Sequence, residues 1–347
     1  MKRPVLVSLV LFFCVPLFGA EYTDGRIRLV LDPRIGRFSL YYLADPFRQK
    51  YEAMFMDQDP RTSVLTLSCN GKTYRLGESP EFTVREEGTP QAPALIFESS
   101  FATVTEEFNF IATGDSDTTN GVWISFVIKN NSRRRIQAGL RLLLDTKLGE
   151  MGSTHFTTDI RSIEEETILD ATTQDRFWVS GPPGESSLMG SVSASVNRIP
   201  DKIHIANWKR LNDAPWALDY AQGRKFNNPP YSIRDSALAY YYEPVRIERE
   251  GNVSFSLLLA SWDSRDFSSL HSLKVPRDPP VRELEDQTAE IFFPDMNPAI
   301  TRSDYNALLD IIEQINAYLN SGVPISDDEI TSIEQDLNRI RSRYTGQ

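Results

Sequence analysis

The hydrophobic pattern of residues 21–262 is typical of short β-strands separated by polar turns. Apolar residues recur at every second position in several segments, so that Val122, Ile124, Phe126 and Ile128 share one face. We expect strands at Arg26–Leu31, Gly36–Leu43, Thr62–Cys69, Lys72–Leu76, Pro93–Ser99, Val104–Ile111, Val122–Lys129, Ile136–Leu144, Phe177–Val179, Ser191–Val196, Lys202–Ile205, Ala237–Tyr242 and Val253–Ala260. No long helical period interrupts them, which predicts a mainly β fold, one large antiparallel β-sandwich over residues 21–270.

Three turns carry further predictions. Asn70-Gly71 is a strong hairpin signal between its two flanking strands. Asn130-Asn131-Ser132 predicts a return of the chain, with Arg133-Arg134-Arg135 as the charged tip of a hairpin. Asp115–Gly121 resembles a calcium loop, but Gly121 falls at the seventh place rather than the sixth, so we interpret this segment as a hairpin turn.

The pattern changes after Trp262. Residues 271–300 are rich in proline and predict an extended connector with one further strand at Ala289–Phe293. Residues 301–347 predict a helical hairpin, because apolar residues recur there every three or four positions. The two stripes, which are candidate partner-binding residues, are Leu308, Ile312, Ile315, Leu319, Ile330, Ile333, Leu337 and Ile340. One hairpin of this length buries too little to stand alone, so it must pack on the β domain, a second copy or a protein partner.

The N-terminus predicts export. Residues 1–20 combine a basic start, a short apolar run and a small-residue exit at Gly19-Ala20, as in a cleavable signal peptide. A membrane anchor or a buried strand is the alternative interpretation. The residues before Cys14 do not suit lipidation, and no later segment is apolar enough to span a membrane. We therefore expect a soluble periplasmic or secreted bacterial protein.

Charge and cysteine content exclude some functions. Loss of Lys2 and Arg3 with the signal would change the formal net charge from −11 to −13. An acidic chain disfavours nucleic acid and anionic membrane surfaces as partners. Cys69 would be the one remaining cysteine, which excludes an internal disulfide and a cysteine zinc site. It lies in an apolar run, where a cysteine is usually a buried hydrophobic residue.

Aromatic and charged residues gather between Asn207 and Tyr231. The candidate ligand-binding residues are Trp208, Trp216, Tyr220, Arg224 and Tyr231. Flat rings beside guanidinium and carboxylate groups suit a sugar, because rings cover its apolar faces and charged groups bind its hydroxyls. The alternative is that these rings anchor the loop to the sandwich, because a long ordered loop needs such contacts.

The segment Asp145–Gly149, with Glu150 and His155 after it, ends a strongly apolar strand. Such groups suit a hard cation or acid–base chemistry, but the alternative is a polar turn, because no second carboxylate is fixed nearby by the sequence. The three histidines share no metal-ligand spacing, and no known catalytic motif is present. Neither a metal site nor a cofactor is therefore predicted, and no catalytic residue is assigned.

Two stretches resemble known domains: one runs from Trp123–Asn130 through Leu140–Gly149 to Phe156, and the other is Asp235–Pro244. Their long apolar strands are similar to secreted bacterial β-sandwich domains of the galactose-mutarotase-like and carbohydrate-binding type. That resemblance implies the fold and no single activity. Those domains usually continue Asn-Asp-Gly after the glycine, whereas this chain has Glu150-Met151-Gly152, so the resemblance assigns no metal or ligand role to this turn.

Two functions follow as hypotheses. The first is a non-enzymatic periplasmic binding or scaffolding protein, which assembles through the C-terminal hairpin and has a possible glycan ligand on the aromatic loop. The second is a carbohydrate-active enzyme that uses paired carboxylates on the sandwich face. The sequence does not separate them, because its 48 Asp and Glu residues offer many pairs of unknown separation.

Overall fold

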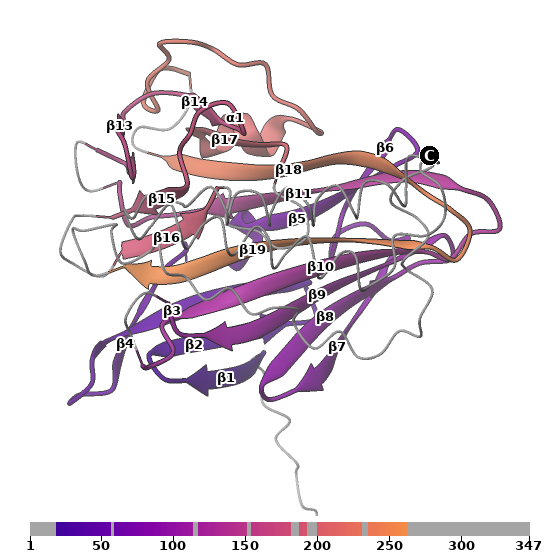
Figure 1. The fold of residues 1–347 in the computed structure, drawn as a ribbon, viewed down its shortest axis with the longest axis horizontal. Helices are drawn as coiled ribbons and strands as arrows, with labels where there is room; N and C mark the ends of the chain where they lie inside the picture. Colours follow the sequence, from indigo (N-terminus) through magenta and orange to yellow (C-terminus); the bar gives the residue numbers. More distant parts are fainter. Residues whose placement is uncertain are drawn as a thin grey trace, which may run out of the picture. The chain divides into compact units, whose positions relative to one another are not determined.

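The strands form three antiparallel sheets in a computed structural model that describes residues 19–56, 59–113, 117–150, 154–181, 187–192, 200–230 and 235–262 (Figure 1). A four-stranded sheet has the order β1 (Ala20–Asp24), β2 (Ile27–Asp32), β3 (Arg37–Asp45), β4 (Lys50–Ala53). A six-stranded sheet has the order β14 (Thr167–Leu169), β17 (Lys202–Asn207), β18 (Ser236–Ile247), β11 (Ile136–Asp145), β5 (Val64–Cys69), β6 (Lys72–Arg75). The prediction of a mainly β chain is confirmed.

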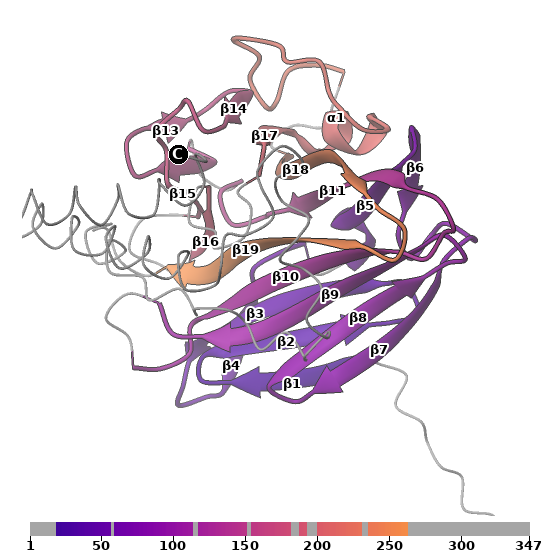
Figure 2. The same ribbon diagram turned by 45° about the vertical axis from the view of Figure 1, so that its right-hand side comes forward.

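The third sheet has nine strands. Its order is β13 (Ser162–Ile163), β12 (Phe156–Thr158), β15 (Phe177–Ser180), β16 (Ser187–Ser191), β19 (Asn252–Trp262), β10 (Gly121–Asn130), β9 (Ala102–Ile111), β8 (Ala92–Glu98), β7 (Thr83–Thr89). β19 is the last described strand, yet it lies in the middle of this sheet, between β16 and β10 (Figure 2).

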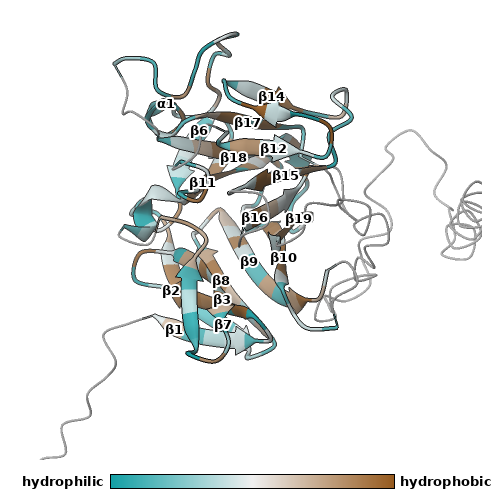
Figure 3. Cartoon of the chain, turned by 90° about the vertical axis from the view of Figure 1, so that its left-hand side faces the viewer, coloured by the Kyte–Doolittle hydropathy of each residue, from teal (hydrophilic) through white to brown (hydrophobic). Residues whose placement is uncertain are grey.

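The nine-stranded sheet packs against both other sheets through one continuous hydrophobic core. Phe38 of β3 contacts Phe108 of β9 at a ring separation of 4.9 Å, and Tyr242 of β18 contacts Phe255 of β19 at 4.7 Å. Apolar residues concentrate on strands within the stack, such as β15 and β17 (Figure 3). The described residues belong to one compact unit, Met1–Pro279, in which this core supplies the main stabilisation.

The Asn70-Gly71 hairpin is confirmed. β5 pairs with β6, and both turn residues have positive φ, +50° for Asn70 and +80° for Gly71. This conformation is that of a type I′ turn, whose twist matches the two strands and which Asn-Gly adopts readily.

The predicted hairpin around Arg133-Arg134-Arg135 is wrong. β10 pairs with β9 and β19 in the nine-stranded sheet, whereas β11 pairs with β5 and β18 in the six-stranded sheet. The connection therefore crosses from one layer to the other. Both strands have apolar residues that need the shared core, and alternation alone does not identify a strand's partner.

Some predicted segments have a different outcome or remain untested. The strand expected at Ser191–Val196 overlaps β16 at Ser191 alone, and residues 193–199 lie outside the described part of the chain. Residues 1–18, the connector 271–300 and the hairpin 301–347 also lie outside it. Two short helices are described, η1 (Pro60–Thr62) and α1 (Trp208–Asp213). Within the described residues no helix has the length and hydropathy needed to cross a membrane.

Candidate functional site

Residues 207–230, here called the covering segment, cross the outer face of the six-stranded sheet (Figure 1). Along β11 the side chains alternate: Leu142 and Leu144 face the core, whereas Leu143 belongs to a small outer cluster. Leu211 of α1 is fully buried in that outer cluster. The covering segment is thus held by its own apolar contacts with the sheet.

Asn207 fixes both ends of the covering segment. Its side-chain oxygen caps α1 by accepting hydrogen bonds from the backbone of Lys209 (3.0 Å) and Arg210 (3.4 Å). Its amide nitrogen donates to the carbonyls of Phe226 (3.0 Å) and Asp235 (2.8 Å). One buried side chain therefore sets the start of the helix and the return of the chain to β18.

A buried charged cluster holds the middle of the covering segment. Glu166 accepts hydrogen bonds from His204 (3.0 Å), from the Arg210 guanidinium and from the backbone of Ala221 (2.9 Å). Burial would raise the pKa of Glu166, but these hydrogen bonds hold it below its usual value. The cluster positions the segment, and its Glu166 and His204 side chains are both buried.

The structure places four of the five predicted ligand residues, and Tyr231 lies outside the described residues. Trp208 and Trp216 are half-buried against the outer cluster. The Trp208 indole donates to the Thr62 carbonyl at 2.9 Å, and the Trp216 ring lies edge-on to Tyr241. These two contacts are of the kind expected if the tryptophans anchor the covering segment to the six-stranded sheet.

The other two described residues make separate contacts. Tyr220 is 48% exposed, with its ring 6.2 Å from that of His204. The Arg224 guanidinium donates to the carbonyls of Asn228 (3.1 Å) and Pro229 (3.0 Å). Neither residue joins the outer cluster that holds the two tryptophans. The ligand role of all five remains a prediction.

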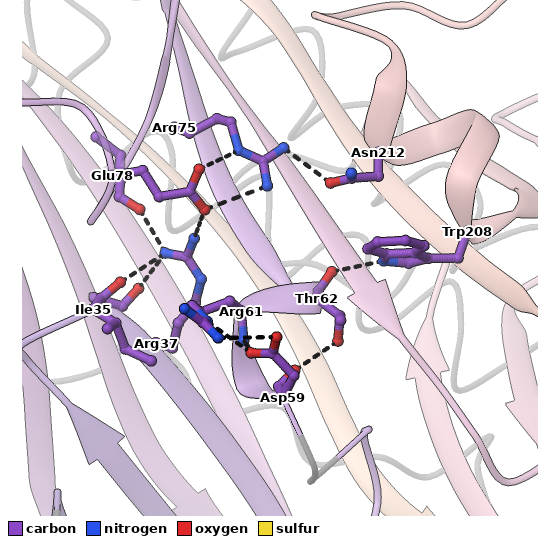
Figure 4. A network of polar contacts seen from close by, with 11 residues as sticks. Ile35, Arg37, Asp59, Arg61, Thr62, Arg75, Glu78, Trp208 and Asn212 are labelled. Atoms are coloured by element: carbon purple, nitrogen blue, oxygen red, sulfur yellow. Dashed lines mark hydrogen bonds and ion pairs between the residues drawn. The ribbon is translucent and has the colours of Figure 1, made fainter.

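A polar pocket of about 470 Å³ lies between β5, β6 and the covering segment. Its charged groups satisfy one another (Figure 4). Arg75 donates to Glu78 (2.7 Å) and Asn212 (3.1 Å), and Glu78 also accepts from the buried Arg37 at 2.6 Å. Arg141, which also lines the pocket, donates to the carbonyls of Leu211 and Ala214. A ligand there would have to displace hydrogen bonds that already exist.

A second pocket, of about 510 Å³, lies where the Asn70-Gly71 turn meets the β10–β11 connection. We call it the basic pocket. Its lining residues are Cys69, Asn70, Lys72, Tyr74, Phe101, Ser132, Arg133, Arg134, Arg135 and Ile136. Both walls are fixed by side-chain amides: Asn70 accepts from the Gln137 backbone (2.9 Å), and Asn130 donates to the Arg134 carbonyl (2.8 Å). The pocket is therefore built on rigid backbone.

Aromatic rings form one side of the basic pocket. Tyr74 and Phe101 are half-buried with ring centroids 5.2 Å apart, and Phe82 packs against both at 5.5–5.7 Å. Burial, with Cys69 and Glu81 nearby, raises the pKa of Tyr74, so its hydroxyl stays neutral at physiological pH. The rings give the pocket an apolar surface beside its charged rim.

Four exposed cations surround the pocket: Lys72, Arg133, Arg134 and Arg135. Within the described part of the chain none of the four forms an ion pair, whereas many other basic side chains do, as Arg85 does with Glu87 (2.8 Å). Such a concentration of unpaired positive charge is notable in a chain of net charge −11. It creates a local positive potential that attracts anions.

The predicted polar turn after β11 contains a cluster of carboxylates. One oxygen each from Asp145, Glu150 and Asp235 lies within 4.8 Å of the other two. β11 pairs with β18 so that Asp145 lies opposite Ala237, which brings Asp235 to the same strand end. We call this group the acidic cluster.

Burial raises the pKa values of the acidic cluster. The pKa of Glu150 rises to about 7, by burial first and by Asp235 and Asp145 next. The pKa of Asp235 rises to about 6, by burial and then by Asp145, and burial also raises that of Asp145. Within the described residues none of the three forms an ion pair with a basic side chain.

His155, predicted as part of the same site, lies beside the acidic cluster without joining it. Its Nδ1 is 2.7 Å from the Ser236 hydroxyl, and the Ser236 backbone donates to Glu150 at 3.1 Å. Sequence reasoning missed Asp235, which lies 85 residues after Glu150. Its sequence signals were its position two residues before the strand predicted at Ala237–Tyr242 and its place at the start of the stretch Asp235–Pro244.

No family model matches the sequence, and no curated protein matches it. Among solved structures the fold is similar to a galactose mutarotase related enzyme from Lactobacillus acidophilus, at 9% identity over 72% of this chain and 98% of that chain, with a TM-score of 0.40. It is also similar to a galactose mutarotase-like protein from Lactobacillus casei, at 8% identity over 70% of this chain and 100% of that chain (TM-score 0.42).

A TPR-domain containing protein from Parabacteroides distasonis is similar at 12% identity, over 84% of this chain and 54% of that chain, with a TM-score of 0.47. Solved structures similar to this chain therefore include galactose mutarotase-like proteins at low sequence identity, as the resemblance in the sequence predicted. No residue role is transferred from any of them.

Proposed function

We propose that this protein is a non-enzymatic binding protein whose ligand is a short anionic glycan held in the basic pocket. The observation that supports this proposal is the group of four unpaired cations around a pocket with a partly exposed aromatic side. A pocket of about 510 Å³ lies within the size range of small-ligand sites, roughly 300–1,000 Å³.

The chemistry of the pocket suits a sugar that carries carboxylate or sulfate groups. Guanidinium groups bind such anions through paired hydrogen bonds, and Arg133–Arg135 supply three of them on one fixed connection. The faces of Tyr74 and Phe101 suit the apolar faces of a sugar ring. A long polyanion is disfavoured, because the acidic remainder of the chain would repel it.

Binding rather than catalysis is proposed because the basic pocket is lined mainly by cationic hydrogen-bond donors and aromatic rings. Among the described residues that line the pocket there is no carboxylate or histidine, the usual side chains for proton transfer to a sugar. The basic pocket is preferred to the polar pocket for a physical reason. Its four cationic side chains form no ion pair with any described residue, whereas Arg75, Glu78 and Asn212 already bind one another.

Calorimetry with uronate-containing, sulfated and neutral oligosaccharides tests this proposal on the full chain. We expect acidic oligosaccharides to bind with an affinity that falls with added salt. Replacement of Arg133 and Arg135 by alanine should weaken binding by about tenfold or more. The matched control is Arg85→Ala, which removes an arginine of β7 that pairs with Glu87 and Glu98 and should leave the affinity unchanged. Binding of neutral sugars alone, or equal losses in both variants, would contradict the proposal.

The second candidate is a carbohydrate-active enzyme that uses the acidic cluster. It is favoured by one observation: Glu150, with a pKa of about 7, lies beside Asp235, with a pKa of about 6, as in acid and base pairs. Glu150→Gln should then abolish turnover of a sugar substrate while calorimetry still detects binding. Failure to detect hydrolysis or epimerisation by the wild-type chain across a broad sugar panel would reject this candidate.

A further inference from the structure

The acidic cluster gathers negative charge in a place where charge is costly. Asp145 is 3% exposed, and its Oδ1 has no hydrogen-bond partner among the described residues, although a hydroxyl from Thr62 reaches the carboxylate. Glu150 and Asp235 are half-buried beside it. Three mutually repelling carboxylates without a basic partner in the described part of the chain need either protons or a cation to neutralise them.

The spacing of the carboxylates suits one cation. Ca²⁺ binds oxygen ligands at about 2.3–2.6 Å, so oxygens on opposite sides of the ion lie about 5 Å apart. One oxygen from each of the three side chains falls within 4.8 Å of the others. Mg²⁺, with ligands at about 2.1 Å, requires a stricter octahedral geometry and usually keeps several of its waters, which favours Ca²⁺ at a site of protein carboxylates.

Hydrogen bonds already hold the backbone of Asp145 and Asp235 in place. The Asp145 amide donates to the Ser63 hydroxyl at 3.0 Å, and the Asp145 carbonyl accepts from Met56 at 2.9 Å. The Asp235 carbonyl accepts from Trp208 (3.1 Å) and from the Asn207 side chain. Preorganised ligands lose little conformational freedom on binding, which favours affinity.

We propose that Asp145, Glu150 and Asp235 form a calcium site where β11 and β18 meet. Two observations carry the inference: the convergence of three carboxylates from two distant parts of the chain, and the buried, unpartnered oxygen of Asp145. All three candidate ligands are carboxylate oxygens, the ligand type of hard cations such as Ca²⁺. Zn²⁺ is instead bound mainly by histidine nitrogen and cysteine sulfur. Bound Ca²⁺ joins the turn after β11 to the segment that leads into β18.

Calorimetry and thermal unfolding of the full chain test the site, after treatment with a chelator and dialysis. Added CaCl₂ should bind and raise the midpoint temperature, because it binds the folded chain alone. MgCl₂ at the same concentration should have a smaller effect. Asp145→Asn and Glu150→Gln should each weaken calcium binding by about tenfold or more. The matched control is Asp213→Asn, which removes an exposed carboxylate of α1 that pairs with Lys209.

The isosteric variants remove repulsion, so we expect them to fold without calcium, and circular dichroism checks this. Absence of any calcium effect on the wild-type chain would overturn the inference. Equal calcium affinity in the wild type and in the Asp145→Asn/Glu150→Gln double variant would overturn it as well. Neither result bears on glycan binding in the basic pocket, which is tested with different residues and a different ligand.

Discussion

The indole nitrogen of Trp178 donates a hydrogen bond of 2.6 Å to the hydroxyl of Tyr240, and this bond joins the two layers inside the core. The Tyr240 hydroxyl in turn donates to the Ser191 carbonyl at 2.9 Å. Both rings are fully buried, so no water is available to replace either bond. This chain of bonds connects β15, β16 and β18.

Tyr240→Phe should therefore destabilise the protein. It would leave the Trp178 nitrogen and the Ser191 carbonyl buried without a partner, at a cost of about 1–3 kcal/mol. Urea unfolding followed by tryptophan fluorescence measures the change. Tyr220→Phe, at a 48% exposed position, is the control and should change the free energy of unfolding little. Equal effects of the two substitutions would contradict the argument.

Glu106 should make stability depend on pH. It is fully buried in the core, where burial raises its pKa from 4.5 to about 8 despite the nearby Arg37. Between these two pH values the folded chain keeps a proton that the unfolded chain releases, so stability falls as pH rises from 4.5 to 8. Glu106→Gln removes this dependence, and its advantage over the wild type should grow across that range by about 2 kcal/mol or more. Urea unfolding at pH 5, 6, 7 and 8 gives the free energy of unfolding of both proteins. A difference between them that stays constant with pH would contradict the prediction.

Trp208→Ala separates the two interpretations of the covering segment. As an anchor, Trp208 should contribute about 2 kcal/mol or more to stability, below the roughly 3–5 kcal/mol of a fully buried tryptophan. Glycan affinity would then be unchanged. As a ligand residue, it should contribute to affinity with little loss of stability. Phe47→Ala, at a fully exposed position, is the control for loss of an aromatic ring.

The predicted stripes of the C-terminal hairpin remain to be tested. Ile312→Glu together with Ile333→Glu places charge on both stripes and should abolish any assembly that depends on them. Light scattering of the full chain measures the change in mass. Gln314→Glu together with Gln335→Glu adds the same charge away from the stripes and should leave the mass unchanged. A wild-type chain that is already monomeric would count against assembly.

Export also remains a prediction. If the signal peptide is cleaved after Ala20, mass spectrometry of the chain from the periplasmic fraction should give Glu21 as its first residue. β1 begins at Ala20, which pairs with Leu31, so cleavage there would remove one residue from this edge strand. Recovery of the full-length chain from the cytoplasm alone would reject the prediction.

Strand positions were predictable because alternation is a local property. β10 and the β5–β6 turn match their predictions within one or two residues, since side-chain period and Asn-Gly geometry act over short distances. Partners were not predictable: β11 contacts β18, about 100 residues later. The acidic cluster was not predictable for the same reason, because only the pairing of β11 with β18 brings Asp235 close to Glu150. The charge of Arg133–Arg135 was visible in the sequence. Its proximity to the rings of Tyr74 and Phe101 in the basic pocket was not.

The central place of β19 has a consequence for synthesis on the ribosome. The nine-stranded sheet is two separate groups of strands until residues 252–262 have emerged and paired with both β16 and β10. Before that point each group presents an open edge, and open edges pair readily with other chains. Release of a nascent chain shorter than about 250 residues would thus leave two unjoined half-sheets, so completion of this sheet must wait for β19.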